Sequence, residues 1–371
     1  MNEMRLLIDQ ISMHQENIVF LEEKVKRKEH ECEQLRTVVQ DLEKKAVGSL
    51  IREAEVPVAA VVIMACNRAD YLERTIKSIL KYHSSVALKF PVFVSQDGSN
   101  SDVRTMAMGY DQLTYMQHLD YEPVHMERPE ELIAYYKIAR HYKWALDQLF
   151  YKHNFNRVII LEDDMEISPD FFEYFEAGAD LLDKDKSIMA ISSWNDNGQK
   201  QFVHDPYTLY RSDFFPGLGW MLTKPTWDEL SPKWPKAYPF QQGSSLGQFF
   251  QQYLKPIKLN DIQVDWKSMN LSYLMEDKFV KYFADLVKNA KPLDGTDLVS
   301  KTNNVDGDVR IQYRDQSHFE NIAHQYGIFD EWKDGIPRTA YKGVVVFRHQ
   351  TLKCVFIVGP DSLQQLGIQS A

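Results

Sequence analysis

The chain has 371 residues, of which 44% are hydrophobic and 12% aromatic, a composition typical of globular and not of disordered proteins. Its net charge of −10, with no Lys/Arg cluster interleaved with aromatics, argues against a general nucleic-acid binder. No run of about 18 apolar residues predicts a membrane span, and the first residues lack the pattern of a signal peptide. Three cysteines, Cys32, Cys66 and Cys354, are too few for a disulfide framework, and at least one must be free or joined to a partner. We therefore expect a soluble chain that forms one large or two ordinary domains.

Residues 1–46 carry a heptad pattern that predicts a coiled-coil stem helix. With Met4 at position a, every a and d position except His14 and Lys28 is apolar or cysteine, and the segment contains no Pro or Gly. β-branched residues at a with Leu at d favour a parallel dimer, with Cys32 in an a layer. The alternative is a helix that packs against its own domain. Residues 47–55 are interpreted as a linker.

From residue 56 to residue 193, strand-like and helix-like patterns alternate. We expect strands at 56–65, 90–95, 158–161 and 188–193, and helices at 70–82, 132–151 and 169–182. This alternation predicts a mostly parallel sheet with right-handed crossovers. Shorter strand-like pieces at 308–313, 343–347 and 353–358 predict a smaller α+β lobe at residues 291–371.

Three carboxylates, Glu162, Asp163 and Asp164, directly follow the apolar run at 158–161. Alternation along a strand predicts Glu162 and Asp164 on one side and Asp163 on the other. In an open α/β sheet, ligands bind beyond the carboxyl ends of the strands. Adjacent carboxylates repel one another unless a cation is present, and a hard ion such as Mn²⁺ or Mg²⁺ usually arrives with substrate phosphates. The pattern therefore predicts a metal and phosphate site, with a solvated acidic loop as the alternative.

Polar residues also end two other expected strands. Arg68, after the first strand, suits bidentate contacts with phosphate oxygens. Asp97, after the second, can accept a hydrogen bond from a base or ribose, or can form a turn. No P-loop and no G-x-G-x-x-G follow the first strand, which argues against kinase-type and dinucleotide-dependent enzymes. Residues 207–234 combine aromatics with glycines, a pattern that suits a sugar or base but also a buried hydrophobic corner.

A series of motifs in order along the chain resembles the N-acetylglucosaminyltransferase I family, most closely its plant members. The likeness runs from Val56 nearly to the C-terminus. The motifs are Ala-Cys-Asn-Arg, Val-Ser-Gln-Asp, Tyr-Tyr-Lys-Ile-Ala-Arg-His-Tyr-Lys-Trp-Ala-Leu, Glu-Asp-Asp, Pro-Asp-Phe-Phe-Glu-Tyr-Phe, Ser-Trp-Asn-Asp-Asn-Gly, Asp-Phe-Phe-Pro-Gly-Leu-Gly-Trp, Ser-Leu-Gly-Gln-Phe-Phe and Val-Gly-Pro-Asp-Ser-Leu. One such motif is weak, whereas this many in order is specific.

The resemblance implies a GT-A nucleotide-sugar fold at residues 56–290 and an inverting transfer of GlcNAc. The donor would be UDP-GlcNAc and the acceptor the α-1,3-linked mannose of a high-mannose N-glycan, which starts complex and hybrid glycan synthesis. Inversion in one displacement needs a metal for the leaving diphosphate and a carboxylate base for the acceptor hydroxyl. By motif, the donor contacts would be Arg68, Asp97, His141, Glu162, Asp163, Leu218 and Ser245, and Asp164 would hold Mn²⁺.

The resemblance further implies a type II membrane-anchored enzyme of the Golgi lumen that forms a homodimer or a transferase complex through its stem. The anchor is expected to be absent here, because Met1 falls at the start of the stem.

The chain departs from the family pattern after Tyr238. Family members continue there into Trp-Asp-Asp-Trp, which contains the catalytic base, whereas this chain reaches Gly243 after four residues. We therefore expect an internal deletion near 238–243, and no residue is assigned as the base; Asp196 and Asp213 are the other acids considered. Two hypotheses stay open, an active transferase and a non-catalytic variant that binds UDP-sugar or dimerises. A metal-dependent nucleotidyltransferase, a third reading, is disfavoured by the family likeness.

Overall fold

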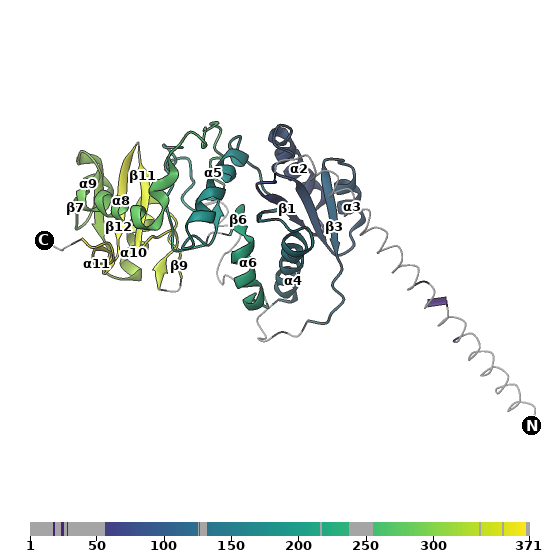
Figure 1. Cartoon of the computed structure of the whole chain (residues 1–371). Coiled ribbons are helices and arrows are strands. Elements are labelled where there is room, and N and C mark those ends of the chain that lie inside the picture. Colours follow the sequence, from purple (N-terminus) through teal and green to yellow (C-terminus); the bar gives the residue numbers. More distant parts are fainter. Residues whose placement is uncertain are drawn as a thin grey trace, which may run out of the picture. The chain divides into compact units, whose positions relative to one another are not determined.

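The computed structural model describes residues 56–124, 126, 132–215, 217–236, 255–333, 335–350 and 352–368, together with four stem positions. Met1–Val56 and Pro57–Ala371 form two separate units (Figure 1). The four described stem residues, Ile18, Lys24, Val25 and Lys28, are helical. The rest of the predicted coiled coil and the linker at 47–55 lie outside the described residues. Within the described part of the chain, no helix has both the length and the apolar character needed to cross a membrane.

The second unit contains a six-stranded sheet with the strand order β3-β2-β1-β4-β6-β5 (Figure 1). Its strands are β1 (Ala60–Ala65), β2 (Val92–Asp97), β3 (Leu113–His118), β4 (Arg157–Glu162), β5 (Ile191–Ser192) and β6 (Trp220–Thr223). Strands β1 to β4 pair in parallel, while β6 runs antiparallel to both β4 and β5. Every residue of β1 is buried, as expected for a strand that is covered on both faces.

Helices cover both faces of this sheet, as the alternating pattern predicts. They are α2 (Ala69–His83), α3 (Ser101–Met108), α4 (Ile133–Asp147) with a π-helical turn (Gln148–Lys152), α5 (Phe171–Lys184), α6 (Lys224–Leu230) and a 3-10 turn (Ser231–Lys233). Val61 and Ile63 of β1 pack with α2, α3 and α5 on one face, and Val62 packs with α4 and α6 on the other. A strand side-chain period of two therefore divides the apolar residues of β1 between two cores.

A second, four-stranded sheet has the order β11-β12-β8-β7. It consists of β7 (Lys291–Leu293), β8 (Val309–Gln312), β11 (Val344–His349) and β12 (Lys353–Val358). The helices around it are a 3-10 turn (Leu271–Leu274), α8 (Glu276–Asn289), α9 (Leu298–Asn304), α10 (Gln316–Tyr326) and α11 (Ser362–Gln365), and a short hairpin joins β9 (Trp332–Lys333) to β10 (Ile336–Pro337). Pro57–Ala371 pack as one compact unit that holds both sheets. The boundary at residue 290 stays a prediction.

Most sequence-based elements are present, with shifts at their ends. The strand expected at 56–65 begins only at Ala60, and the one expected at 188–193 is reduced to Ile191–Ser192. The helix expected at 132–151 ends its α-helical part at Asp147 and continues as the π-helical turn. Strands β3 and β6 were not predicted.

Candidate functional site

Three predicted site segments meet at one edge of the six-stranded sheet, because β1, β2 and β4 are parallel neighbours. Arg68 follows β1 in the loop before α2, Asp97 ends β2, and Glu162 ends β4. The Arg68 guanidinium pairs with the Asp163 carboxylate and also lies 3.0 Å, Nη1 to Oδ2, from Asp164. The cation that balances these carboxylates in the structure is therefore an arginine from the neighbouring strand end.

The turn after β4 places the three acids differently from the prediction. Strand β4 ends at Glu162, so strand alternation does not extend to the next two residues, and Asp163 and Asp164 contact the same guanidinium. The expectation that Asp163 lies on the opposite side from Asp164 is wrong for this reason. The Asp163 side chain is 5% exposed and that of Asp164 is 38% exposed. Thr75 fixes the turn, because its hydroxyl donates to the Asp163 carbonyl oxygen at 2.9 Å.

Burial changes the pKa values of Glu162 and Asp163. Burial raises the pKa of Glu162, the nearby Asp164 and Asp163 charges raise it further, and a 2.9 Å hydrogen bond from the Tyr142 hydroxyl opposes the shift. Burial also raises the pKa of Asp163, while the hydrogen bond and charge of Arg68 lower it. An added cation at this edge would favour the ionised forms of these carboxyls.

Asp97 is part of a chain of hydrogen bonds and stacked rings beneath α4. Its Oδ1 lies 2.8 Å from Nδ1 of His118, the last residue of β3. The His118 ring stacks on His141 with 5.5 Å between centroids and 11° between planes. His141 Nε2 lies 2.8 Å from the Ser95 hydroxyl. His141 is 5% exposed, and burial lowers its pKa to about 4, opposed by the Asp97 charge.

Sequence reasoning named Asp97 and His141 but missed His118 and Ser95. Ser95 was recoverable in principle, because strand alternation places it on the same side as Asp97. His118 was not, because its position opposite Asp97 depends on the register of β3, a strand that was not predicted.

Leu218 lies at the same edge, two residues before the start of β6. The Ser192 hydroxyl donates to the Leu218 carbonyl oxygen and the Ser193 hydroxyl to that of Gly219, each at 2.9 Å. Gly219 has φ +52°, and a Cβ atom there would lie 2.3 Å from Ser193 Oγ. This close approach requires glycine and fixes the backbone of Leu218. Ser245 and the junction after Tyr238 lie outside the described residues.

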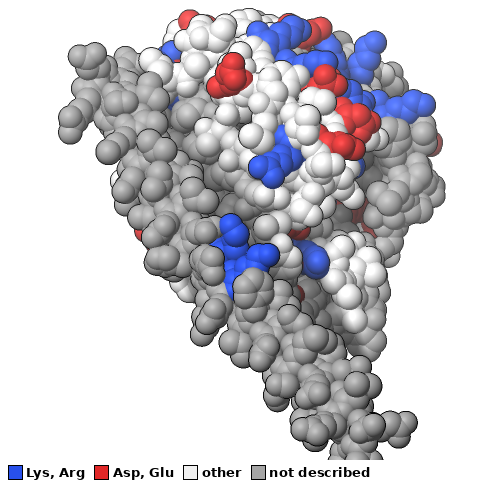
Figure 2. All heavy atoms as spheres, turned by 90° about the vertical axis from the view of Figure 1, so that its right-hand side faces the viewer, with Lys and Arg blue, Asp and Glu red and all other residues white. Residues whose placement is uncertain are grey.

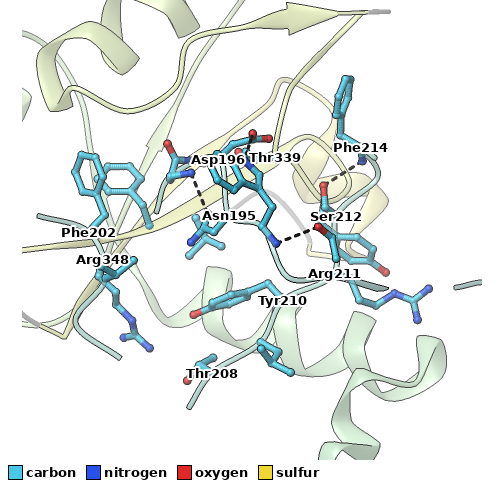
Figure 3. A pocket seen from close by; sticks show the side chains of 18 of the residues that line it. Asn195, Asp196, Phe202, Thr208, Tyr210, Arg211, Ser212, Phe214, Thr339 and Arg348 are labelled. Carbon is cyan, nitrogen blue, oxygen red and sulfur yellow. Dashed lines mark hydrogen bonds between the residues drawn. The ribbon is translucent and has the colours of Figure 1, made fainter. Parts of the chain in front are cut away.

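A cavity of about 260 Å³ lies between the loop after β5 and residues near the second sheet (Figure 3). Its lining combines aromatic, amide and charged side chains, including Trp194, Asn195, Asp196, Tyr210, Phe214 and Arg348. Ser192, whose hydroxyl donates to the Leu218 carbonyl oxygen, also lines it. This mixture of aromatic faces and polar groups is typical of ligand sites.

The two other acids considered from the sequence differ in their surroundings. The Asp196 side chain is 9% exposed, and its oxygens accept from Trp194 Nε1 at 2.9 Å and from Arg338 Nε at 2.8 Å. Burial raises the pKa of Asp196, and the Arg338 charge lowers it. Asp213 is exposed and accepts from the backbone N–H of Lys342 at 2.5 Å. The described contacts of Asp196 are those of a paired structural anion.

The acidic edge fits a divalent ion only with help from a ligand. Among the residues that the structure describes, no group of three or more His, Cys, Asp and Glu side chains is placed to hold a metal. Asp164 offers an exposed carboxylate, and Mg²⁺-type sites commonly combine one or two carboxylates with substrate phosphates and water. On the face drawn in Figure 2, the visible described residues show acidic and basic side chains interspersed.

An α/β sheet with a guanidinium and carboxylates at its carboxyl edge is typical of proteins that bind phosphorylated ligands. The family model described as GNT-I family matches residues 1–240 and 238–370, and the chain belongs to this family. An alpha-1,3-mannosyl-glycoprotein 2-beta-N-acetylglucosaminyltransferase of Arabidopsis thaliana is 62% identical over 396 residues, which cover 100% of this chain and 89% of that protein. The alignment is longer than this chain, so the relative contains residues without a counterpart here.

Similarity to solved structures is much weaker. S. aureus TarS 1–349 in complex with UDP has a TM-score of 0.33 and 13% identity, over 64% of this chain and 67% of that one. The mannosyltransferase PcManGT from Pyrobaculum calidifontis in complex with GDP-Man and Mn²⁺ has a TM-score of 0.31 and 14% identity, over 68% and 72%. These scores are too low to support a conclusion about this chain.

Proposed function

We propose that this chain is an N-acetylglucosaminyltransferase that transfers GlcNAc from UDP-GlcNAc to the α-1,3-linked mannose of N-glycans. The observation that carries the proposal is the 62% identity to the Arabidopsis enzyme along the whole chain. Family membership also supports a GT-A type of fold for the six-stranded sheet, and action in the Golgi lumen. We extend the proposal to a dimer or transferase complex formed through the stem.

The donor would lie at the carboxyl edge of the sheet. Its contacts would be Arg68, Asp97, His141, Glu162, Asp163 and Leu218, with Ser245 assigned by motif alone. Their clustering at the ends of adjacent strands supports this assignment, because the edge brings a guanidinium within reach of diphosphate oxygens. The cavity lined by Ser192, whose hydroxyl donates to the Leu218 carbonyl oxygen, is the candidate place for the acceptor sugar.

Asp164 would be the protein ligand of Mn²⁺. The ion, when bound, neutralises charge on the leaving diphosphate. The chain's own residues hold the acidic turn in position, since Thr75 fixes the turn and Arg68 orients the Asp163 and Asp164 carboxylates. The Tyr142 hydrogen bond fixes Glu162 in the same way.

A second candidate function, donor binding without transfer, is favoured by one specific observation. The family model matches the chain in two segments that meet at residues 238–240, where the sequence predicts the loss of the segment that contains the base. Loss of a general base typically lowers a rate by about 10²–10⁴. The described donor residues all precede this junction, so donor binding would survive it.

Radiolabelled transfer separates the two candidates. The purified chain is incubated with UDP-[³H]GlcNAc, Mn²⁺ and a mannose-terminated N-glycan, and UDP binding is measured in parallel by calorimetry. The Asp164→Ala variant, which lacks the proposed carboxylate ligand of Mn²⁺, serves as the control. Labelled product above this control supports the transferase, whereas UDP binding without product supports the second candidate. Absence of both transfer and UDP binding contradicts both.

A further inference from the structure

His118 has no role in the proposed donor contacts, although it pairs with Asp97, which is one of them. The two residues end neighbouring strands β2 and β3 and are partners in the strand register. A backbone hydrogen bond of 2.9 Å from the Gly98 N–H to the His118 carbonyl oxygen also joins the ends of the two strands. The two side chains are therefore held by the backbone that follows them as well as by their own 2.8 Å contact.

The His118 ring is fixed on its faces by neighbours from α4. His141 stacks on it, and the Trp144 ring lies 5.1 Å away at 37°. The pKa of His141 is lowered to about 4 by burial, so this neighbour is uncharged at neutral pH. Asp120, two residues after His118, pairs with Arg140 of α4 at 3.1 Å. The ring can therefore direct Nδ1 at Asp97 and has little room to rotate, since its side chain is only 11% exposed.

The contact with His118 gives one carboxylate oxygen of Asp97 a hydrogen-bond partner and leaves the other without one among the described residues. Oδ1 accepts from His118 Nδ1, which must carry hydrogen because a carboxylate only accepts. Oδ2 has no hydrogen-bond partner within the part of the chain that the structure describes. An acid whose first oxygen is fixed presents the second one in a defined direction.

We propose that His118 is a positioning residue for nucleotide binding: it orients Asp97 so that Oδ2 accepts a hydrogen bond from the ribose or base of a uridine nucleotide. This inference rests on the proposed function, which places the donor at this edge. A hydrogen bond to a charged group contributes enough for its loss to weaken binding about tenfold or more. His118 itself does not touch the ligand.

Three substitutions distinguish positioning from mere packing. The amide nitrogen of Asn lies as many bonds from Cβ as Nδ1 of His, and that of Gln as many as Nε2. His118→Asn therefore restores a donor toward Asp97, His118→Gln places its donor elsewhere, and His118→Leu has none. We expect the Kd for UDP, measured by calorimetry with Mn²⁺, to stay within about threefold of wild type for Asn. For Gln and Leu we expect it to rise about tenfold or more.

A double-mutant test separates this role from general damage. If His118 acts only through Asp97, then His118→Leu combined with Asp97→Ala binds UDP no more weakly than Asp97→Ala alone. Equal Kd values for wild type, Asn, Gln and Leu overturn the inference and leave the proposed function standing. Equal weakening by Asn, Gln and Leu also overturns it, because the ring would then act by packing. Failure of the wild-type chain to bind UDP overturns the proposed function and this inference together.

Discussion

Burial of the His141 imidazole makes the free energy of unfolding depend on pH between neutral and mildly acidic solution. The ring has an ordinary pKa of 6.5 and a pKa of about 4 in the folded chain, with burial as the main cause. Above pH 6.5, His141 is neutral in both folded and unfolded chains, and its contribution to stability is fully present. As the pH falls toward 4, the unfolded chain binds a proton that the folded chain does not, and stability is lost.

The size of the effect follows from the two pKa values. Between pH 7.5 and pH 5, linkage gives a loss of about 2 kcal/mol of unfolding free energy from His141 alone. The matched variant is His141→Gln, which keeps a polar atom at the position of Nε2, 2.8 Å from the Ser95 hydroxyl, and does not titrate. The variant should therefore lose about 2 kcal/mol less than wild type over the same pH interval.

Urea unfolding followed by tryptophan fluorescence at pH 7.5 and pH 5 measures this difference. Other titrating groups are common to both chains, so the comparison isolates position 141. Buried carboxyls with a raised pKa, such as Glu162, change stability in the opposite direction and also cancel. If wild type and His141→Gln lose the same free energy between the two pH values, the reasoning from burial is wrong.

Three further outcomes are expected. Calorimetry on Asp164→Ala should show that UDP affinity no longer depends on Mn²⁺; unchanged metal dependence would remove this acid from the site. Gly219→Ala should lower the free energy of unfolding by about 3 kcal/mol or more, because backbone strain adds to a clash with Ser193 Oγ. The control is Gly327→Ala, at a position that also has positive φ but open space around it, and this variant should lose about 1 kcal/mol. Equal losses in urea unfolding would argue against the clash. A peptide of residues 1–46 should sediment as a dimer; a monomer at high concentration would refute the heptad interpretation.

The buried centre of the sheet was predictable because its strands carry continuous apolar runs. Residues 158–161 are all buried in β4, and the ends of β1, β2 and β4 meet as parallel strands require. Edge strand β3 was missed because its burial is only partial, so Thr114 and Gln117 interrupt the apolar signal. Strand β6 is four residues long, and its pairing with β4 and β5, not its sequence, defines it.

Side-chain partners within the site were harder to predict than the residues themselves. The pairing of Arg68 with Asp163 joins positions far apart in sequence and depends on the turn that ends β4 at Glu162. Local alternation assigned Asp163 to the wrong side because it assumed that the strand continued. His118 reached the site only through the register of an edge strand.

The contact between Asp196 and Arg338 has a consequence for dividing the chain. Asp196 belongs to the loop after β5, and its counterion comes from a segment more than a hundred residues later, next to β10. The Phe329 N–H also donates to Asn197 Oδ1 at 2.9 Å. A fragment that ends at residue 290 would keep all described donor residues, but it would lose Arg338 and Phe329, the partners of Asp196 and Asn197. A nucleotide-binding fragment that keeps these contacts must therefore extend past Arg338.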